Sequence, residues 1–217
     1  MLHDRLEAGG DVLVVRRAGD GVAVVAGGEL VGRRAAGMSL ALGSPLPWPT
    51  LSADEQARLE AGEVVVQADT SGDKTVSTGI IRVKADATKT WAAVLDFPAR
   101  IPETPGLVSV KEYKRNSASD WFVRFEMSRF GIRAIIHDHW TCELAANQCS
   151  WALDPSQASD LELNDGWMLA KTDGTTTYLA FHAELIVKQW VPGWVRRWLA
   201  VDSMDNTLSK IRDRAQK

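Results

Sequence analysis

Residues 191–214 read VPGWVRRWLAVDSMDNTLSKIRDR, and this pattern predicts one long helix near the end of the chain. Pro192 fits the first turn of such a helix, because a backbone N–H at that position would have no partner within the helix. Bulky apolar residues recur at three- and four-residue spacing and give the helix an apolar stripe: Trp194, Trp198, Val201, Leu208 and Ile211. The stripe implies that the helix packs against a layer formed by earlier residues.

Six segments before this helix have the residue pattern of β-strands: Leu107–Arg115, Trp121–Ser128, Ile132–Leu144, Cys149–Leu153, Trp167–Lys171 and Thr175–Lys188. Most connections between them carry residues suited to tight reversal, which predicts an antiparallel meander. One connection differs, because Asp154–Asp165 is long for a hairpin loop and has no strong apolar pattern. We interpret this segment as a functional loop or lid.

Shorter elements precede the meander. Ser52 and Glu55 have the spacing of a capping box, which predicts a short helix that ends at Gly62. Two strands and two helical segments are expected next, at Glu63–Gln67, Thr75–Lys84, Ala87–Leu95 and Ala99–Glu103. The expected order is therefore a short helix, two strands, two helical segments, six strands and a long helix.

The first 50 residues differ from the rest, since they are rich in Gly, Ala and Val and poor in large core residues. Short strands are expected at Asp11–Arg17 and Val22–Leu30, and an extended linker at Ser44–Pro49. Arg33-Arg34 followed by Ala35–Leu42 faintly resembles a twin-arginine export signal, but the apolar stretch is short and interrupted by glycine. We favour an arm at residues 1–50, structural or disordered, followed by one domain at residues 51–217.

Charge and composition exclude several classes of function. The net charge is -3 and no block of basic residues is present, which argues against nucleic-acid binding. No run of about 18 apolar residues occurs, so no membrane span is expected and the protein is expected in the cytoplasm or the periplasm. Cys142 and Cys149 flank a hairpin turn. We favour two free thiols, with a disulfide as the alternative if the strand register makes these residues partners.

Three phrases of the sequence resemble the START-like (SRPBCC) superfamily, which includes polyketide cyclases and coenzyme-Q-binding proteins. They are Trp91–Phe97, Gly166–Leu169 with Asp173–Thr176, and Trp190–Trp194. The resemblance rests on their order and spacing and covers residues 63–214. It implies an α+β helix-grip fold, in which a curved antiparallel sheet wraps around the long C-terminal helix with an apolar cavity between them. It also implies a hydrophobic ligand such as a lipid, sterol, quinone or polyketide, although a fold by itself does not define a function.

The side chains that face this expected cavity follow from strand alternation and from the helix stripe. The candidate ligand-binding residues are Trp121, Val123, Phe125, Ile136, Asp138, Trp140, Trp151, Trp167, Phe181, Leu185, Trp194, Trp198 and Met204. The direction of Trp167 depends on the turn that follows its strand. A two-residue turn at Asp173-Gly174 places Trp167 on the face of Tyr178, whereas a bulge places it on the face of Phe181.

Asp138 is the most informative polar candidate, because it lies on an otherwise apolar strand face. A buried carboxylate needs a partner or a proton. Asp138 could anchor a ligand hydroxyl or headgroup, and the alternatives are a structural pair with an arginine or a position open to water. His137 and His139 lie on the opposite face, where we favour solvated side chains over a metal site, because a metal needs further ligands. No catalytic residue, metal or cofactor is expected.

We interpret the chain as a non-catalytic binding or carrier protein for a hydrophobic small molecule. The alternative is a polyketide cyclase or dehydratase that uses Asp138 as its acid or base, or else Tyr178 or His182 if the other strand face points inward. A third interpretation is a scaffold whose interior is filled by its own side chains.

Tryptophans and arginines lie together at the start of the predicted last helix. Arg196-Arg197 stands among Trp190, Trp194 and Trp198. Because tryptophan favours the lipid interface and arginine favours anionic headgroups, this composition suggests transient membrane contact. The alternative is an ordinary helix surface next to a core.

Overall fold

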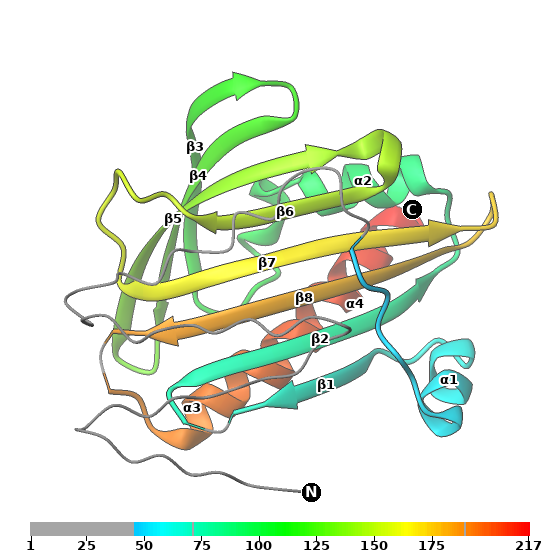
Figure 1. Cartoon of the computed structure of the whole chain (residues 1–217), viewed down its shortest axis with the longest axis horizontal. Helices are drawn as coiled ribbons and strands as arrows, with labels where there is room; N and C mark the ends of the chain where they lie inside the picture. The colour runs from blue at the N-terminus through cyan, green and yellow to red at the C-terminus, as the bar shows by residue number, and fades with distance from the viewer. Residues whose placement is uncertain (1–45, 71, 189) are drawn as a thin grey trace, which may run out of the picture. The chain divides into compact units, whose positions relative to one another are not determined.

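An eight-stranded antiparallel sheet organises the described part of the chain, in the order β1-β2-β8-β7-β6-β5-β4-β3 (Figure 1). This computed structural model describes residues 46–70, 72–188 and 190–217. The strands are β1 (Val65–Asp69), β2 (Lys74–Val83), β3 (Leu107–Ser117), β4 (Asp120–Arg129), β5 (Ile132–Glu143), β6 (Gln148–Leu153), β7 (Leu161–Thr172) and β8 (Thr177–Val187). The predicted meander is confirmed, and the first hairpin joins it through the pairing of β2 with β8.

The predictions for the N-terminal arm concern residues that the structure does not describe. The strands at Asp11–Arg17 and Val22–Leu30 and the Arg33-Arg34 segment all lie outside the described residues. The division of the chain at residue 50 stays a prediction.

Two short helices begin where local capping predicted them. Helix α1 (Ala53–Glu60) has the complete capping box, with the backbone amide of Ser52 donating to the Glu55 carboxylate at 2.8 Å. Helix α2 (Ala87–Leu95) begins at Asp86, whose carboxylate accepts from the backbone amide of Lys89 at 2.8 Å. These caps satisfy amides that the first turn of a helix leaves without partners. The next expected turn is a 3-10 helix at Pro98–Arg100.

The predicted C-terminal helix runs from Gly193 to Ala215 and is wider in its middle. It consists of α3 (Gly193–Arg197), a π-helical segment (Trp198–Asp202) and α4 (Ser203–Ala215). Pro192 stands at the N-cap position, one residue before the first turn. No helix of the described residues combines the length and the apolar character that a membrane crossing requires.

Helices α2 and α4 cover one face of the sheet, which we call the inner face. The packing is closest at Gly79 of β2, where an added Cβ would lie 2.7 Å from the side chain of Met204 and would also overlap Leu208. A larger residue at this position would force the side chains of Met204 and Leu208 to shift. Met204, Leu208 and Ile211 are buried together with Ile81 in the main core.

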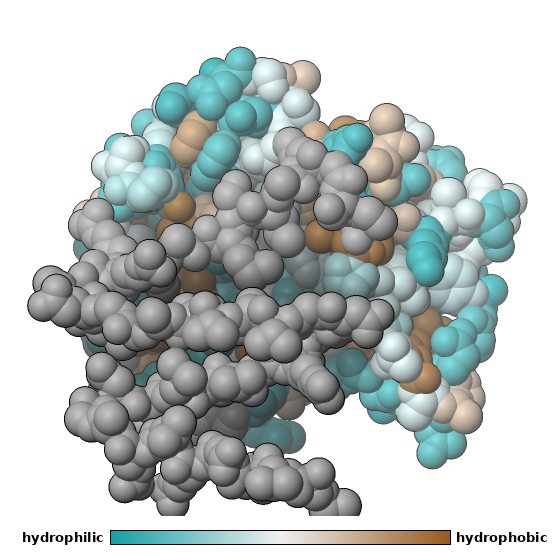
Figure 2. All heavy atoms as spheres, viewed as in Figure 1, coloured by the Kyte–Doolittle hydropathy of each residue, from teal (hydrophilic) through white to brown (hydrophobic). Residues whose placement is uncertain are grey.

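The opposite face, which we call the outer face, carries a second and smaller apolar cluster. Leu59 of α1 packs there with Val65 and Ile80, and Leu46 and Trp48 pack against the same cluster. The segment that leads into α1 therefore crosses the outer face over β7 and β8 (Figure 1). Figure 2 shows the molecule from this side, with hydrophilic residues gathered over the hairpin of β3 and β4.

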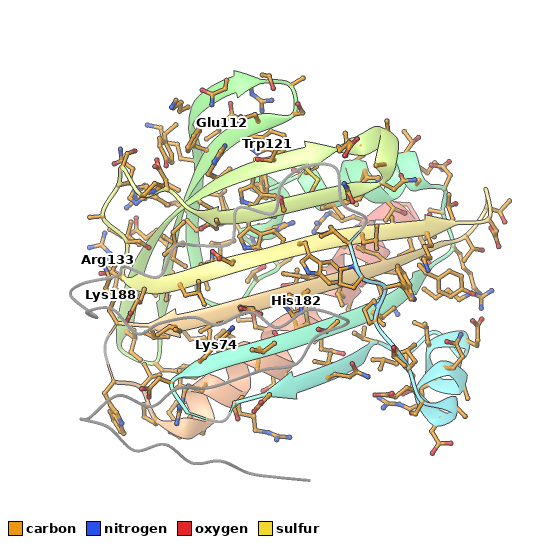
Figure 3. All side chains as sticks on the ribbon, viewed as in Figure 1. Lys74, Glu112, Trp121, Arg133, His182 and Lys188 are labelled. Carbon is orange, nitrogen blue, oxygen red and sulfur yellow. A yellow bond between two sulfur atoms is a disulfide. The ribbon has the colours of Figure 1, made fainter. Side chains whose placement is uncertain are left out.

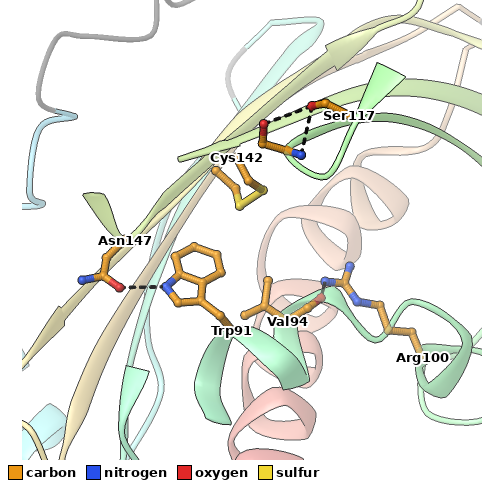
Figure 4. Close-up of a disulfide and its surroundings, with 8 residues drawn as sticks. Trp91, Val94, Arg100, Ser117, Cys142 and Asn147 are labelled. Carbon is orange, nitrogen blue, oxygen red and sulfur yellow. Dashed lines mark hydrogen bonds between the residues drawn. A yellow bond between two sulfur atoms is a disulfide. The ribbon is translucent and has the colours of Figure 1, made fainter. Parts of the chain in front are cut away.

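The two cysteines form a disulfide, so the prediction of two free thiols was wrong. Cys142 and Cys149 are directly opposite each other on β5 and β6, with their Cα atoms 4.0 Å apart. The connection between these strands ends at Asn147 in the left-handed conformation, and it produces the register that makes the cysteines partners. Asn147 also accepts a hydrogen bond from the Trp91 indole at 3.2 Å, which ties this hairpin to α2 (Figure 4).

We expect reduction of this disulfide to destabilise the protein, because the crosslink restricts the unfolded chain. For the short loop between Cys142 and Cys149, the loss in the free energy of unfolding should be about 2 kcal/mol. The measurement is urea denaturation with and without dithiothreitol. The double variant Cys142→Ala/Cys149→Ala is the control and should not respond to reductant. Two reactive thiols in the unreduced, denatured protein would contradict the crosslink.

Candidate functional site

Cross-strand pairing aligns the inward side chains in rows across the sheet. One row contains Thr75 of β2, Leu185 of β8 and Asn164 of β7. The next row runs from β2 to β4 and comprises Ser77, Ala183, Gly166, Trp151, Trp140 and Trp121. Helix α4 packs on the rows that follow, through Gly79 and Ile81. The first two rows therefore lie beyond the start of α4, toward the π-helical segment, which adjoins β1 and β2.

Burial along the inner face separates a closed half from a half that is not fully covered. Met168 and Leu179, in the rows near α4, are fully buried. By contrast, three inward-facing apolar residues outside those rows are only half-buried: Phe125, Ile136 and Leu185. Phe181 is also half-buried, although it lies in the row of Gly79 and Met168. Apolar side chains that face inward without being covered are what a hydrophobic ligand needs.

An aromatic wall stands between these two halves. The rings of Trp140 and Trp151 stack with their centroids 4.6 Å apart, and Phe181 meets Trp151 edge-on at 5.3 Å. Phe97, from the connection after α2, meets Trp140 edge-on at 5.1 Å. This stack requires Gly166, because an added Cβ there would overlap the Trp151 ring. The indole N–H of Trp140 is buried and has no hydrogen-bond partner among the described residues.

Asp138 is buried at the uncovered end of the inner face. Its side chain is 3% exposed, and the Asn164 amide donates to both carboxyl oxygens at 2.9 and 3.0 Å. Burial, with a smaller contribution from nearby Asp165, raises the pKa of Asp138 to about 8, although the Asn164 hydrogen bonds act in the opposite direction. At neutral pH the group is therefore mainly protonated and can donate a hydrogen bond. Neither of the structural alternatives applies, since Asp138 is not open to water and its partner is not an arginine.

Two more polar groups lie on the same face, and sequence reasoning missed both. Asn164 is the partner of Asp138, and the Thr75 hydroxyl is buried without a hydrogen bond in the described structure. Asn164 was missed because Leu161–Asp165 was assigned to a loop, whereas it forms the first part of β7. The alternation Leu161-Glu162-Leu163-Asn164 was the signal that could have identified the strand.

The expected lid at Asp154–Asp165 needs correction in length and in character. Only residues 154–160 lie outside the strands. These residues run along β5, with the Asp154 amide donating to the His137 carbonyl and the Asp160 amide to the Ile135 carbonyl, each at 2.8 Å. The Asp160 carboxylate also accepts from the Ile135 amide at 2.6 Å. The segment is therefore hydrogen-bonded to the sheet, unlike a lid that lifts away.

Trp167 is the candidate residue that faces the wrong way for the site. It lies on the outer face, pairs in register with His182, and stacks on that imidazole with the centroids 5.2 Å apart. The register Thr172↔Thr177 puts Trp167 on the same face as Tyr178. The face is that of the alternative without a bulge, but the connection has four residues, 173–176, and not the two of the expected turn. His182 and Tyr178 are thereby also removed from the inner face.

The candidates on the last helix occupy different environments. Met204 is buried against Gly79. Trp194 is 57% exposed, and its ring packs on Phe130 of the β4–β5 turn, with centroids 4.8 Å apart. Trp198 is half-buried and meets the same phenylalanine at 5.5 Å. Trp194 therefore contributes to the surface beside the site.

The strand histidines have ordinary partners on the outer face. His137 Nδ1 lies 2.7 Å from the Ala158 carbonyl, and His139 Nε2 lies 2.9 Å from the Asp120 carboxylate. Throughout residues 46–70, 72–188 and 190–217, no three His, Cys, Asp or Glu side chains are grouped as metal ligands would be.

A polar surface pocket of about 220 Å³ lies elsewhere, where the end of α1 meets β2 and the end of α4. Its arginines, Arg82 and Arg212, donate to the carbonyls of Glu60 and Gly62 and so satisfy the end of α1. We assign this pocket to helix capping.

Comparison with known proteins identifies the fold. No family model and no curated protein matches the sequence. Among solved structures, a STAR-related lipid transfer protein from Xanthomonas axonopodis aligns with a TM-score of 0.60 at 15% identity, over 71% of this chain and 93% of that chain. A START superfamily protein from Mycobacterium smegmatis aligns with a TM-score of 0.53 at 19% identity, over 64% of this chain and 96% of that one.

The di-domain ARO/CYC BexL of the BE-7585A biosynthetic pathway aligns with a TM-score of 0.52 at 13% identity. The alignment covers 68% of this chain and 52% of that protein. The chain thus has the START-like (SRPBCC) helix-grip fold, as the resemblance in sequence implied. Lipid-transfer proteins and cyclases both occur among the neighbours, so the fold does not distinguish a carrier from an enzyme.

The raised pKa of Asp138 predicts a specific dependence of stability on pH. The unfolded chain releases this proton near its ordinary pKa of 3.8, whereas the folded chain keeps it until about 8. Between these values the folded state binds more protons, so the free energy of unfolding should fall as pH rises and level off above the folded pKa. Asp138→Asn should remove this contribution, which is at most about 1.4 kcal/mol per pH unit.

Urea denaturation at several pH values between these limits gives the slope of the free energy of unfolding against pH. The effect is the difference in this slope between the wild type and Asp138→Asn. Asp205→Asn, at an exposed position on α4, is the matched control and should keep the wild-type slope. Equal slopes for the wild type and Asp138→Asn would show that Asp138 ionises normally in the folded protein.

Proposed function

We propose that the chain binds and carries a hydrophobic small molecule, such as a lipid, sterol or quinone, against the uncovered half of the inner face, without catalysis. The observation that carries this proposal is the set of half-buried inward apolar residues next to a buried, neutral acid. Each ligand methylene removed from water would contribute about 0.8 kcal/mol, so apolar contact alone can supply tight binding.

The polar groups define the headgroup that would fit. The Trp140 indole N–H is a buried donor without an acceptor among the described residues, and a neutral Asp138 would be a second donor on the same face of β5. A ligand oxygen, as in a hydroxyl or a carbonyl, would pair with these donors.

The route into the site would lie under the start of the last helix. A π-helical turn forms weaker hydrogen-bond geometry than an α-helix and occurs often at functional sites. Such a turn separates α3 from α4, and α4 is the part that packs on Gly79. We assign the opening motion to α3 and the π-helical segment, because residues 154–160 are hydrogen-bonded to β5. Cargo exchange by this route would require transient contact with a membrane.

A matched pair of tryptophan variants on β8 tests the location of the ligand. Leu185 and Ile186 are adjacent and half-buried, and they face opposite sides of the sheet. Leu185→Trp should fill the inner face and reduce the apolar ligand that co-purifies by at least about tenfold, at a cost in stability of about 1–3 kcal/mol. Ile186→Trp should retain the ligand.

Native mass spectrometry of the purified protein, followed by organic extraction, measures the bound ligand in both variants, and thermal melting confirms that they fold. The proposal fails if the wild type carries no apolar ligand and if none of a panel of lipids, sterols and quinones changes its melting temperature or tryptophan emission. That result would favour a scaffold whose interior is filled by its side chains.

A second candidate function is acid catalysis, as in a polyketide cyclase or dehydratase. Its support is again Asp138, since a carboxylic acid kept neutral in a buried site can donate a proton to a substrate oxygen. Tyr178 and His182, the other groups considered for this role, lie on the outer face. Turnover that disappears in Asp138→Asn, with substrate binding retained, would establish the enzyme. Equal turnover in both proteins would exclude Asp138 as the acid.

A further inference from the structure

Three aromatic side chains form an exposed cluster at the end of the sheet where α3 meets the β4–β5 turn. Phe130 is 46% exposed and Trp194 is 57% exposed. The Phe130 ring meets both Trp194 and Trp198 edge-on. We call Phe130, Trp194 and Trp198 the aromatic tip. Trp190, just before α3 in the chain, is 86% exposed. A contiguous exposed apolar cluster on a protein surface often marks an interaction site.

The backbone conformation of the β4–β5 turn does not explain why residue 130 is a phenylalanine. Phe130 has a φ of 56° and Gly131 a φ of 76°, and they form the two-residue connection between Arg129 and Ile132. Turns with two positive φ values favour Asn-Gly, and a bulky side chain is costly at the first position. A strained residue of this kind is often found where function requires its side chain.

Cations accompany the aromatic tip. The Arg129 guanidinium lies over the rings of Phe130 and Trp198, 4.7 and 4.3 Å from their centroids. Arg197 is exposed on α3. Arg133 and Lys188 lie at the same end of the sheet (Figure 3), but Arg133 is paired with Glu126 at 2.6 Å and Lys188 donates to the Ser159 carbonyl at 2.6 Å. Arg129 and Arg197 are therefore the two cations that we expect to meet a partner.

We propose that the aromatic tip, with Arg129 and Arg197, is a docking surface for an anionic lipid bilayer. Tryptophan and phenylalanine would enter the interfacial layer, and the arginines would contact lipid phosphates. The two arginines give the tip a local positive charge that suits an anionic bilayer, although the whole chain has a net charge of -3. The tip includes Trp198, the first residue of the π-helical segment, so docking would bring the proposed opening against the lipid. As a step in cargo exchange this inference rests on the proposed function, but the contact with the bilayer does not require a cargo.

Vesicle flotation tests the surface directly. The full chain should bind vesicles of phosphatidylcholine that contain about one third phosphatidylglycerol, bind pure phosphatidylcholine weakly, and detach as salt screens the charges. Phe130→Asn should weaken binding about tenfold, since it removes the ring while restoring the residue that the turn prefers. Because this substitution suits the turn, its effect cannot be attributed to unfolding. Arg197→Gln should weaken binding about fivefold.

Leu144→Asn is the matched control. Leu144 is 45% exposed, close to the value for Phe130, but it lies in the connection between β5 and β6, at the opposite end of β5. This variant should bind vesicles as the wild type does. The proposal is overturned if the wild type does not float with anionic vesicles, if Phe130→Asn binds as well as the wild type, or if the tip instead mediates a dimer that Phe130→Asn dissociates in sedimentation.

The same variants separate this inference from the proposed function. Phe130→Asn should retain its co-purifying apolar ligand, and Leu185→Trp should retain vesicle binding. A protein that floats with vesicles but carries no ligand would leave the docking surface standing and reject the carrier. A protein that carries ligand but does not float with vesicles would reject the docking surface and leave the carrier standing.

Discussion

The close approach of α4 to β2 at Gly79 is the contact on which the rest of the structure depends. Met204 and Leu208 occupy the space that any larger side chain at this position would need. Because β2 pairs with β8, this contact joins the first hairpin, the last strand and the last helix, which are far apart in the sequence. It also determines which rows of the inner face α4 covers.

Where the coverage by α4 ends, the inner face carries buried polar groups in addition to apolar side chains, and some of these groups have no hydrogen-bond partner in the described structure. Burial raises the pKa of Asp138 to about 8, and among the described residues the Asn164 amide is its hydrogen-bond partner. The Thr75 hydroxyl and the Trp140 indole N–H are buried without partners in the described structure. Each such group costs about 1–3 kcal/mol in an empty protein, and a bound ligand oxygen would recover part of that cost.

The widened turn of the last helix connects this interior to the surface. Trp198 opens the π-helical segment and also packs on Phe130 at the tip of the β4–β5 hairpin. One residue thus belongs both to the segment proposed to open and to the surface proposed to meet a bilayer. A contact made at the tip would act on the helix start without any change in the core around α4.

The sequence by itself determined the features that depend on neighbours along the chain. The capping residues Ser52 and Asp86 start their helices where predicted, and α2 has the predicted bounds. The inward face of β4 and β5 was also predicted, because alternation along a strand is local and the apolar set could point only one way. The helix-grip order of elements followed from the same patterns.

The tertiary structure alone decided what depends on the pairing between strands. The disulfide required the register that places Cys142 opposite Cys149, and the outward direction of Trp167 required the register of β7 with β8. Asn164 became the partner of Asp138 only because β7 begins before the residues that looked like a strand. Register is a relation between distant segments, and a shift by one residue moves every side chain to the other face, so no local pattern contains it.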